Sequence, residues 1–376
     1  MNQPKEIGPG SGPLYGPDFS SFRHDEVGWL LADYTHVHLE RDVARRERDI
    51  QSGKSHYADD LPIELPPNEE YTALFDAALS RNAVIVAAAV AHVADQIDRL
   101  IPDGEVVLVS LARAGVPAGV WIQHRLKTVN ARACQHYAIS IIKGRGVDRH
   151  ALAWIAVHHD PRQVMFVDGW SGKGAIRAEL RQFLRSNLGP FESLFPDRLA
   201  VLADPAGVAD IAGTRDDILI PTACLNSTSC GLVSRTVLPR PGVSSSQYHG
   251  ARMYPEHARF DRTREAIDAV NACSAGASSD TGFMPQVVPL PNMWQLAQRL
   301  GIGDVILMKP GLGETTRVLQ RRVPWSVLVH PDWMKHADLS HIHALAAYRG
   351  TQVVPADTWP YRCIGVIRPQ RLASHP

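Results

Sequence analysis

Residues 163–175 read QVMFVDGWSGKGA, and this stretch does most to decide the fold. The apolar run 164–167 predicts a buried strand, the glycines after it predict a tight turn, and residues 175–184 predict a helix. A strand that leads through a short glycine-containing turn into a helix is the repeating unit of a parallel sheet. We therefore expect such a sheet around this stretch.

Similar units lie on both sides of it. Apolar strands alternate with helical segments, and continuous apolar strands fit a sheet that is covered on both faces. The sequence therefore predicts an α/β fold, a parallel sheet with helices on both faces. The expected strands are residues 106–111, 136–142, 199–202 and 218–220, and the expected helices are residues 82–100, 118–126 and 148–158.

The chain also divides into parts. Two stretches rich in Pro, Ser and Gly, 239–248 and 271–282, are typical of surface loops or linkers. Beyond them a second alternation predicts a small α/β domain, with helices at 293–300, 314–322 and 339–348 and strands at 304–308, 326–329, 352–354 and 363–367. We therefore expect a flexible N-terminal arm (1–19), a hood-like segment (20–80), a main domain (81–260), a linker (261–290) and the small C-terminal domain (291–376).

Charge separates these parts. The 376 residues carry 39 Lys and Arg and 39 Asp and Glu, so the formal net charge is zero. This balance excludes a basic surface for nucleic acid that covers the whole chain. Residues 291–376, however, hold ten Lys and Arg against five acids, so this domain carries +5 and the rest carries −5. The small domain is the part whose charge favours a polyanionic partner.

The cysteines and the apolar segments indicate the cellular compartment in which the protein is expected. Five Cys without a CxxC pair argue against a disulfide framework or a zinc ribbon. The first 19 residues have Pro and Gly where a signal peptide needs an apolar stretch. The most apolar segment, 83–94, is shorter than the roughly 20 residues of a membrane span. We expect a cytoplasmic protein in a reducing compartment with no membrane span.

The turn after the central strand has the features of an anion site. Ser171, Gly172, Lys173 and Gly174 open the helix, so backbone N–H groups and the helix N-terminus can converge on a phosphate. Asp168 ends the strand, where open α/β sheets bind ligands. The alternative is an ordinary strand-to-helix turn, and the spacing of a P-loop is missing.

Two more loops follow strands in the same way. In SLARAGVP, residues 110–117, Arg113 lies among the small residues Ala112, Ala114 and Gly115, and a guanidinium suits phosphate or pyrophosphate oxygens. Two such loops at adjacent strand ends are more specific than either alone. In KGRGVD, residues 143–148, Lys143 and Arg145 make either a mobile cationic loop or a solvated turn.

Residues 224–235 hold the remaining candidates. Cys224 and Cys230 flank LNSTS, but nothing in the sequence places a histidine beside either thiol, and a buried structural cysteine is the commoner outcome. The polar residues of this stretch form either an acceptor pocket or a network of turns. They are Asn226, Ser227, Thr228, Ser234 and Arg235.

These motifs carry a resemblance. The acid-ended strand with its Gly/Ser loop resembles the 5-phosphoribosyl diphosphate (PRPP) loop of type I phosphoribosyltransferases, and SLARAGVP resembles their pyrophosphate loop. Residues 17–260 more closely resemble a phosphoribosyltransferase-like family from bacterial tellurite-resistance and stress gene clusters, some members of which are labelled cysteine protease StiP. The matching stretches are HYADDLPIE, VSLARAGVP, HYAISIIKGRGVD, FVDGWSGKGAI and LNSTSCGLVSRT.

The resemblance implies a Mg²⁺-dependent phosphoribosyl transfer from PRPP or ribose 5-phosphate to a nucleobase-like or other acceptor. Residues 171–174 would hold the 5-phosphate, residues 112–115 the pyrophosphate, and Asp168 would face the ribose and possibly the metal. Arg113, Lys143 and Arg145 would act with Asp168 in catalysis, in a chain that could form a homo-oligomer. Many phosphoribosyltransferases have two adjacent acids where this chain has Asp168-Gly169. Two alternatives stay open, a non-catalytic module that senses PRPP or a nucleotide, and a cysteine peptidase.

The C-terminal residues carry a second resemblance. LMKPGLGETTRVLQRRVPWSVLV, DLSHIHALAAYRG and YRCIGVIRP resemble a Pelota-type RNA-binding domain. Arg317 and Arg321 are four residues apart on one helix face, which suits an RNA backbone, and Lys309 and Arg322 lie beside them. The resemblance implies binding of structured RNA. The alternative is that these cations dock the small domain on the acidic main domain.

Overall fold

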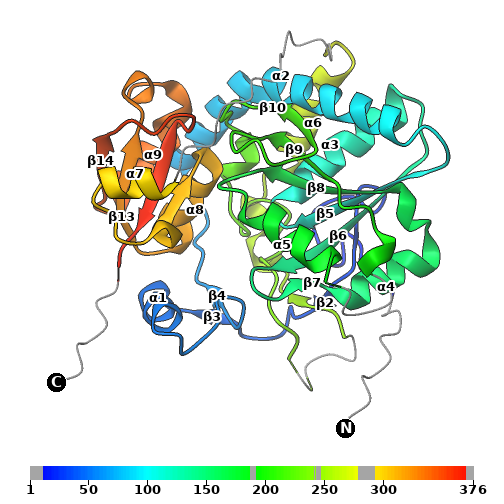
Figure 1. Ribbon diagram of the computed structural model, residues 1–376, viewed down its shortest axis with the longest axis horizontal. Helices are drawn as coiled ribbons and strands as arrows, with labels where there is room; N and C mark the ends of the chain where they lie inside the picture. Colours follow the sequence, from blue (N-terminus) through cyan, green and yellow to red (C-terminus); the bar gives the residue numbers. More distant parts are fainter. Residues whose placement is uncertain (1–11, 187–191, 241, 243–246, 278–292, 370–376) are drawn as a thin grey trace.

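The computed structural model describes residues 12–186, 192–240, 242, 247–277 and 293–369. Figure 1 shows the C-terminal residues, coloured yellow to red, as a separate lobe beside the main sheet. The fold is therefore α/β, with a parallel main sheet flanked by helices and a small C-terminal domain with a mixed sheet.

The main sheet has the strand order β1-β6-β5-β8-β9-β10, and each neighbouring pair is parallel. In β5, Val106 and Leu108 pack into one apolar cluster while Val107 and Val109 pack into another, so both faces of the sheet are covered. The strands are β1 (Gly28–Trp29), β5 (Val106–Ala112), β6 (Cys134–Ile142), β8 (Val164–Trp170), β9 (Leu199–Ala203) and β10 (Ile211–Thr214), with β7 (Gly146–Val147) antiparallel to β6.

Helices cover the two faces as the alternation predicted. One face packs against α2 (Glu69–Leu100), α3 (Gly115–Thr128) and α6 (Thr263–Ser274). The other face packs against α4 (Arg149–His158) and α5 (Ala175–Leu184). Helix α2 begins 13 residues earlier than predicted, where the Asn68 side chain accepts from the backbone N–H of Tyr71.

Helix α2 is long and apolar enough to cross a membrane by length and composition alone. Half of its most apolar window is buried inside the protein, however, and Val86, Val90 and Val93 belong to the core beneath the sheet. A buried core helix of a globular protein passes the same test, so this helix is weak evidence for a membrane span.

The N-terminal residues wrap the sheet. The backbone of Leu14 pairs with Trp29, and Phe19 is buried, so the described part of the expected arm is packed on the main domain. Short parallel pairs follow, and they place the segment that contains Glu64 near the C-terminal domain. Strand β2 (Ala32–Asp33) pairs with β11 (Gly250–Ala251), and β3 (Glu40–Arg41) pairs with β4 (Leu61–Pro62). Helix α1 (Val43–Gln51) lies between β3 and β4 in the chain.

The C-terminal domain is a mixed sheet of order β12-β15-β13-β14. Its helix α8 begins at the glycine-rich turn that the sequence predicted, and it packs on β15. The strands are β12 (Met308–Pro310), β13 (Pro324–Val329), β14 (Gln352–Pro355) and β15 (Cys363–Ile367), and the helices are α7 (Met293–Arg299), α8 (Leu312–Arg321) and α9 (Ser340–Tyr348).

Two predicted strands are wrong. Residues 218–220 are buried but form no strand, because they fill the interface between the main sheet and α8 instead of joining a ladder. Residues 304–308 are mostly the 3₁₀ turn η5 (Val305–Leu307), which Asp304 caps, and β12 starts only at Met308. In both places the apolar residues indicated burial, but burial does not require the backbone to pair with another strand.

The two domains dock through specific polar contacts. Asp217 of the main domain accepts from the backbone N–H groups of Leu312 at 3.1 Å and Arg362 at 2.9 Å. The carboxylate therefore caps the first turn of α8 from outside that domain. Burial raises the pKa of Asp217 to about 6, and these two N–H groups oppose the rise.

Candidate functional site

The two loops singled out from the sequence lie at neighbouring strand ends. Strands β5 and β8 pair in parallel, so the loop after Ala112 and the loop after Trp170 meet at one edge of the sheet. Helix α8 of the C-terminal domain lies at the same edge. The predicted phosphate loop and the predicted RNA-binding cations line a common cleft, although the sequence placed them in separate sites.

The loop 171–174 is covered by the C-terminal domain. Lys173 Nζ donates to the carbonyl oxygens of Val305 at 2.7 Å and Met308 at 3.2 Å. Tyr361 donates its hydroxyl hydrogen to the carbonyl oxygen of Gly172 at 3.0 Å. Burial, together with Lys309 and Lys143, lowers the pKa of Lys173 to about 8. The cation expected to meet a phosphate is thus engaged by backbone carbonyls of the other domain.

Asp168 lies near the end of β8, which continues for two residues beyond the predicted strand end, and it lines the cleft with Lys173, Glu314 and Arg317. Burial raises its pKa to about 7, although Arg317 and the N–H of Gly169 favour the charged form. The Gly169 N–H donates to Asp168 Oδ1 at 2.8 Å. This carboxyl is therefore half-protonated near neutral pH.

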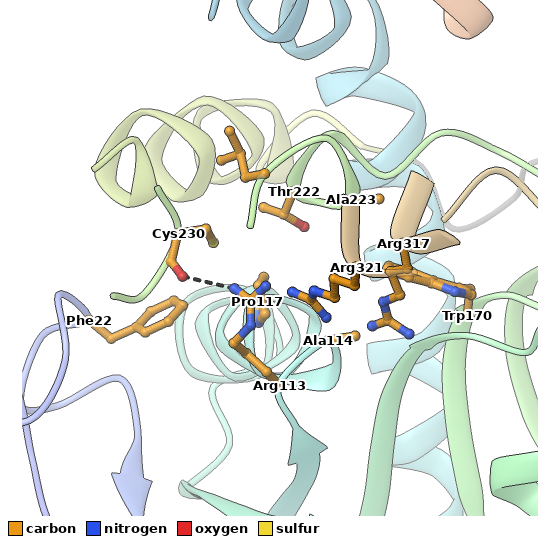
Figure 2. Close-up of a pocket in the computed structure, with 11 residues that line it drawn as sticks. Phe22, Arg113, Ala114, Pro117, Trp170, Thr222, Ala223, Cys230, Arg317 and Arg321 are labelled. Atoms are coloured by element: carbon orange, nitrogen blue, oxygen red, sulfur yellow. Dashed lines mark hydrogen bonds between the residues drawn. The ribbon is translucent and has the colours of Figure 1, made fainter. Parts of the chain in front are cut away.

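A small cavity opens beside the other loop (Figure 2). The volume open to a water-sized molecule is about 30 Å³. The guanidinium groups of Arg113, Arg317 and Arg321 converge on it, the first from the main domain and the other two from α8. Its other lining residues are Phe22, Ala114, Pro117, Trp170, Thr222, Ala223, Leu225 and Cys230.

Two of these arginines have carboxylate partners. Arg321 Nε lies 2.5 Å from Glu64 Oε1, and Arg317 Nη1 lies 2.6 Å from Glu314 Oε1. Arg317 also stacks on Trp170, with 4.5 Å between its guanidinium carbon and the indole centroid. Although burial opposes ionisation, Arg321 and Arg113 hold the pKa of Glu64 at about 2, so this carboxylate stays charged.

Arg113 differs from its neighbours. Its Nη1 donates to the carbonyl oxygen of Cys230 at 3.0 Å, and its buried Nε has no hydrogen-bond partner among the residues the structure describes. No carboxylate within that described part lies in ion-pair range of it. Burial and Arg321 lower the pKa of Arg113 to about 10, so the group is still charged at neutral pH.

Cys230 lies on the wall of this cavity and belongs to a polar chain. Burial raises the pKa of its thiol to about 11, while Arg113 and a hydrogen bond with the Thr263 hydroxyl lower it. Thr263 Oγ1 in turn donates to Asp261 Oδ1 at 2.5 Å. Burial raises the pKa of Asp261. The thiol is thus linked through one hydroxyl to a carboxylate.

Cys224 lies on the other side of the same loop. It lines an apolar groove of about 520 Å³ between the start of α2 and helices α8 and α9. Its carbonyl oxygen accepts from Tyr71 at 2.8 Å and Gln320 at 2.9 Å, and burial raises the pKa of its thiol well above that of Cys230. The loop between the two cysteines therefore separates the cationic cavity from the groove. All five cysteines are free thiols.

The other predicted residues lie outside the cavity. Lys143 and Arg145 are exposed, on a loop whose N–H groups at Gly144 and Gly146 donate to Glu179. The polar stretch after Cys224 is a network of turns. Its members bond partly to one another and partly to residues 57–65 of the N-terminal segment: Asn226 to Leu65 and Thr228, Ser227 to Glu64, Ser234 to Arg235 and Arg252, and Arg235 to Tyr57 and Asp60.

The cations chosen for RNA face the main domain. Arg317 stacks on Trp170, Arg321 pairs with Glu64, Arg322 pairs with Glu47 at 2.6 Å, and Lys309 lines the cleft with the loop 171–174. In this arrangement the docking alternative accounts for their contacts. Contact of these four cations with RNA stays a prediction, and it requires the two domains to separate.

Sequence reasoning missed several residues that build this site. Glu64, Glu314 and Trp170 hold the arginines in place, and Asp261 and Thr263 extend from Cys230. Trp170 stood inside the quoted stretch, but nothing indicated that an arginine from the far end of the chain would stack on it. A signal existed for Glu64, which ends the HYADDLPIE motif.

Mg²⁺ was expected to be held through PRPP, with Asp168 as a further candidate contact. In the described ranges, no group of three His, Cys, Asp or Glu side chains is placed to hold a metal ion. The expected Mg²⁺ stays a prediction, and no step proposed for this protein depends on it.

Comparisons with known proteins identify the chain. The model of a family described as "Tellurite-like stress resistance cysteine protease StiP" matches residues 20–271, and that of the PELOTA RNA binding domain matches residues 288–369. The chain is 33% identical over 366 residues to a protein named "Cysteine protease StiP" from Acinetobacter baylyi. The match covers 93% of this chain and 94% of that protein.

These findings correct the predicted activity. The prediction of a phosphoribosyltransferase is wrong, because the family and the curated relative that span the same residues are both described as cysteine protease. The resemblance to the stress-resistance family and to the Pelota-type domain is confirmed. The chain belongs to the family of tellurite-like stress resistance cysteine proteases called StiP, and it carries a C-terminal PELOTA RNA-binding domain.

Proposed function

We propose that this protein is a cysteine peptidase whose nucleophile is Cys230. The observation that carries the assignment is the position of this thiol on a cavity wall beside Arg113, at the head of a hydrogen-bonded chain to Asp261. Cys224 lines a different groove, which Arg113 does not line, and burial raises the pKa of its thiol further than that of Cys230. Attack on a carbonyl needs a thiol with access to a substrate and a group to take its proton.

The reaction can be written with these residues. The Cys230 thiol loses its proton through the Thr263 hydroxyl to the Asp261 carboxylate as the sulfur bonds to the substrate carbonyl carbon. The carbon–nitrogen bond then breaks, the leaving amine takes a proton from Asp261, and water hydrolyses the thioester.

The burial of the thiol has a consequence for activity. With a pKa of about 11, Cys230 is protonated at neutral pH. The hydrogen-bond partner of this thiol is a threonine rather than a histidine, so no imidazolium stabilises a resting thiolate. Proton transfer must therefore accompany attack, and the rate should rise with pH above neutrality.

The test uses the full-length protein and a fluorogenic protein substrate such as labelled casein. Cys230→Ala should lower the peptidase rate about 1,000-fold, because removing the nucleophile of a catalytic unit removes most of the rate enhancement. Cys224→Ala is the matched control and should stay within about threefold of the wild type. Loss of activity with Cys224→Ala but not Cys230→Ala would overturn the assignment, as would a wild-type protein without peptidase activity.

We also infer that the main sheet has the type I phosphoribosyltransferase-like fold that the sequence resembles. In this protein the fold would support peptide-bond cleavage instead of phosphoribosyl transfer. The supporting observations are the parallel strand order and the two loops at neighbouring strand ends. Strand ends at one edge of such a sheet present side chains to a common ligand, whichever reaction they serve.

A second role follows for the C-terminal domain. We infer that it binds structured RNA, on the basis of its PELOTA match and its charge of +5. Since Arg317, Arg321 and Arg322 are paired inward, the docked protein would meet RNA through the exposed Lys335, Arg349 and Arg368. The salt dependence of binding to a structured RNA tests this role.

A further inference from the structure

We propose that the cavity beside Cys230 is a specificity pocket for an acidic residue, so that the enzyme cleaves after aspartate or glutamate. This inference rests on the proposed function and adds its substrate class. It follows from the balance of charge inside the cavity, the size of the cavity and the hydrogen bond from Arg113 to the carbonyl oxygen of Cys230.

Among the described residues, the cavity has one more cation than it has carboxylates. Arg321 is neutralised by Glu64 and Arg317 by Glu314, and both pairs lie within 2.6 Å. Arg113 has no carboxylate within ion-pair range in the described part of the chain, although Glu64 is close enough to favour its charged form, so three guanidinium groups share two carboxylates. An unpaired buried charge is costly, so native structures rarely keep one without a use. A carboxylate from a ligand would complete the third pair.

The size of the cavity limits what can enter. A volume of about 30 Å³ gives room for roughly two water molecules, on the measure in which one water needs about 10–15 Å³. Two water positions correspond to the two oxygens of a carboxylate. An aromatic ring or a branched apolar side chain would need the wall to move, and a lysine or arginine would meet Arg113, Arg317 and Arg321 with like charge.

The geometry places that carboxylate at the cleaved bond. Arg113 donates to the carbonyl oxygen of Cys230 at 3.0 Å, so a side chain bound to its guanidinium lies next to the residue that attacks. Arginine suits this task because its planar fork can donate two parallel hydrogen bonds to a carboxylate. The residue so held is the one whose carbonyl Cys230 attacks.

The C-terminal domain completes the pocket. Arg317 and Arg321 come from α8, and Trp170 of the main domain holds Arg317 in place by stacking (Figure 2). Substrate selectivity therefore depends on docking of the domain that carries the PELOTA match. Arg317 acts as a positioning residue, and Arg113 is the group that touches the substrate.

The first measurement compares two substrates with the full-length enzyme, acetyl-Ala-Ala-Asp-aminomethylcoumarin and its Asn counterpart. These differ by one charge at nearly constant shape. The Asp substrate should have a kcat/KM at least 10-fold higher, and a Lys substrate should be cleaved more slowly than the Asn substrate. Equal kcat/KM values for Asp and Asn would overturn the pocket while leaving the peptidase assignment intact.

The second measurement separates the pocket from catalysis. The inactive Cys230→Ala variant should bind a fluorescein-labelled Asp peptide at least 10-fold more tightly than the Asn peptide, and adding Arg113→Met should abolish that difference. Binding that does not depend on Arg113 would overturn the pocket even if the enzyme is active. Acid-selective, Arg113-dependent binding by a protein without peptidase activity would support the pocket and sink the proposed function.

Arg113→Met also provides a control for folding. The substitution removes an unpaired buried charge and keeps much of the side-chain volume, so the melting temperature should stay the same or rise. An unfolded or strongly destabilised Arg113→Met protein would show that Arg113 serves the fold, and the pocket assignment would then be wrong.

Discussion

The loops 110–117 and 171–174 are alike in sequence and differ in what surrounds their cations. Each follows a parallel strand, and each combines small residues with one cation, Arg113 or Lys173. Lys173 is satisfied by two carbonyl oxygens of the C-terminal domain, whereas Arg113 keeps an unpaired nitrogen beside a cavity. A cationic loop at a strand end can therefore bind an anion. Whether its cation is available depends on the contacts that the neighbouring domain makes with it.

The largest expected effect concerns the ion pair between Glu64 and Arg321, which lies beside Arg113. Glu64→Gln leaves Arg321 without its counter-charge and Arg113 without its nearest negative charge. Breaking one partner of a buried pair costs about 3–5 kcal/mol, so the free energy of unfolding in urea should fall by that amount. Arg113→Met in the same assay should show no loss. A Glu64→Gln protein as stable as the wild type would contradict the description of this pair.

A smaller effect should distinguish the two cations directly. Lys173→Met removes two charged hydrogen bonds between the domains and should lower the free energy of unfolding by about 1–3 kcal/mol. It should leave the Asp-over-Asn selectivity within about threefold of the wild type. If Lys173→Met abolishes selectivity and Arg113→Met does not, the roles of the two loops are reversed.

The raised pKa of Asp168 predicts a dependence of stability on pH. Burial raises this pKa to about 7 in the folded protein, above the value of an unfolded chain. The folded state therefore binds more protons than the unfolded state between about pH 4 and 7, and this group makes the protein less stable as pH rises through that window.

Asp168→Asn should remove that dependence. The melting temperature of the variant should exceed that of the wild type by more at pH 8 than at pH 5. Asp160→Asn is the control, because Asp160 is paired with Arg162 near the surface and Arg162 lowers its pKa. A constant difference between Asp168→Asn and the wild type across pH would show that the carboxyl is already ionised in this window.

The smallest effect concerns RNA. In the docked protein, substitution of Lys335, Arg349 and Arg368 by Ala should weaken binding to structured RNA and lower the log–log salt slope by about 2 to 3, since each lost phosphate contact removes roughly 0.7–0.9. Arg317→Ala/Arg321→Ala should leave the slope unchanged. The opposite result would mean that RNA binding separates the domains.

Much of the main sheet could be predicted from sequence, because its strands are continuous apolar runs that end in glycine-containing turns. The strand predicted at residues 218–220 was wrong because these apolar residues are buried by the docking of α8. Composition alone does not distinguish residues buried in this way from residues buried in a β-sheet. Arg113 could be chosen as an anion-binding residue, but its ligand could not. The carboxylates near this cavity come from residues 64 and 314, and only the folded chain shows that they pair with Arg321 and Arg317.

From the sequence alone, the proposed nucleophile was set aside for a related reason. Cys230 was weighed against histidine partners, whereas its contacts are Arg113, more than 100 residues earlier, and Thr263, more than 30 residues later. Neither residue type marks a cysteine as reactive in a sequence. The family and the curated relative, both described as cysteine protease, favour the peptidase alternative that the sequence left open.

One measurement tests the central claim most directly. The protein is treated with acetyl-Ala-Ala-Asp-chloromethyl ketone, an electrophile that carries the proposed acidic residue, and the modified cysteine is mapped by mass spectrometry. The account predicts a single adduct on Cys230 that forms at least 10-fold more slowly with the Asn analogue or in Arg113→Met. An adduct on Cys224, or labelling of Cys230 that is indifferent to the acid and to Arg113, would contradict it.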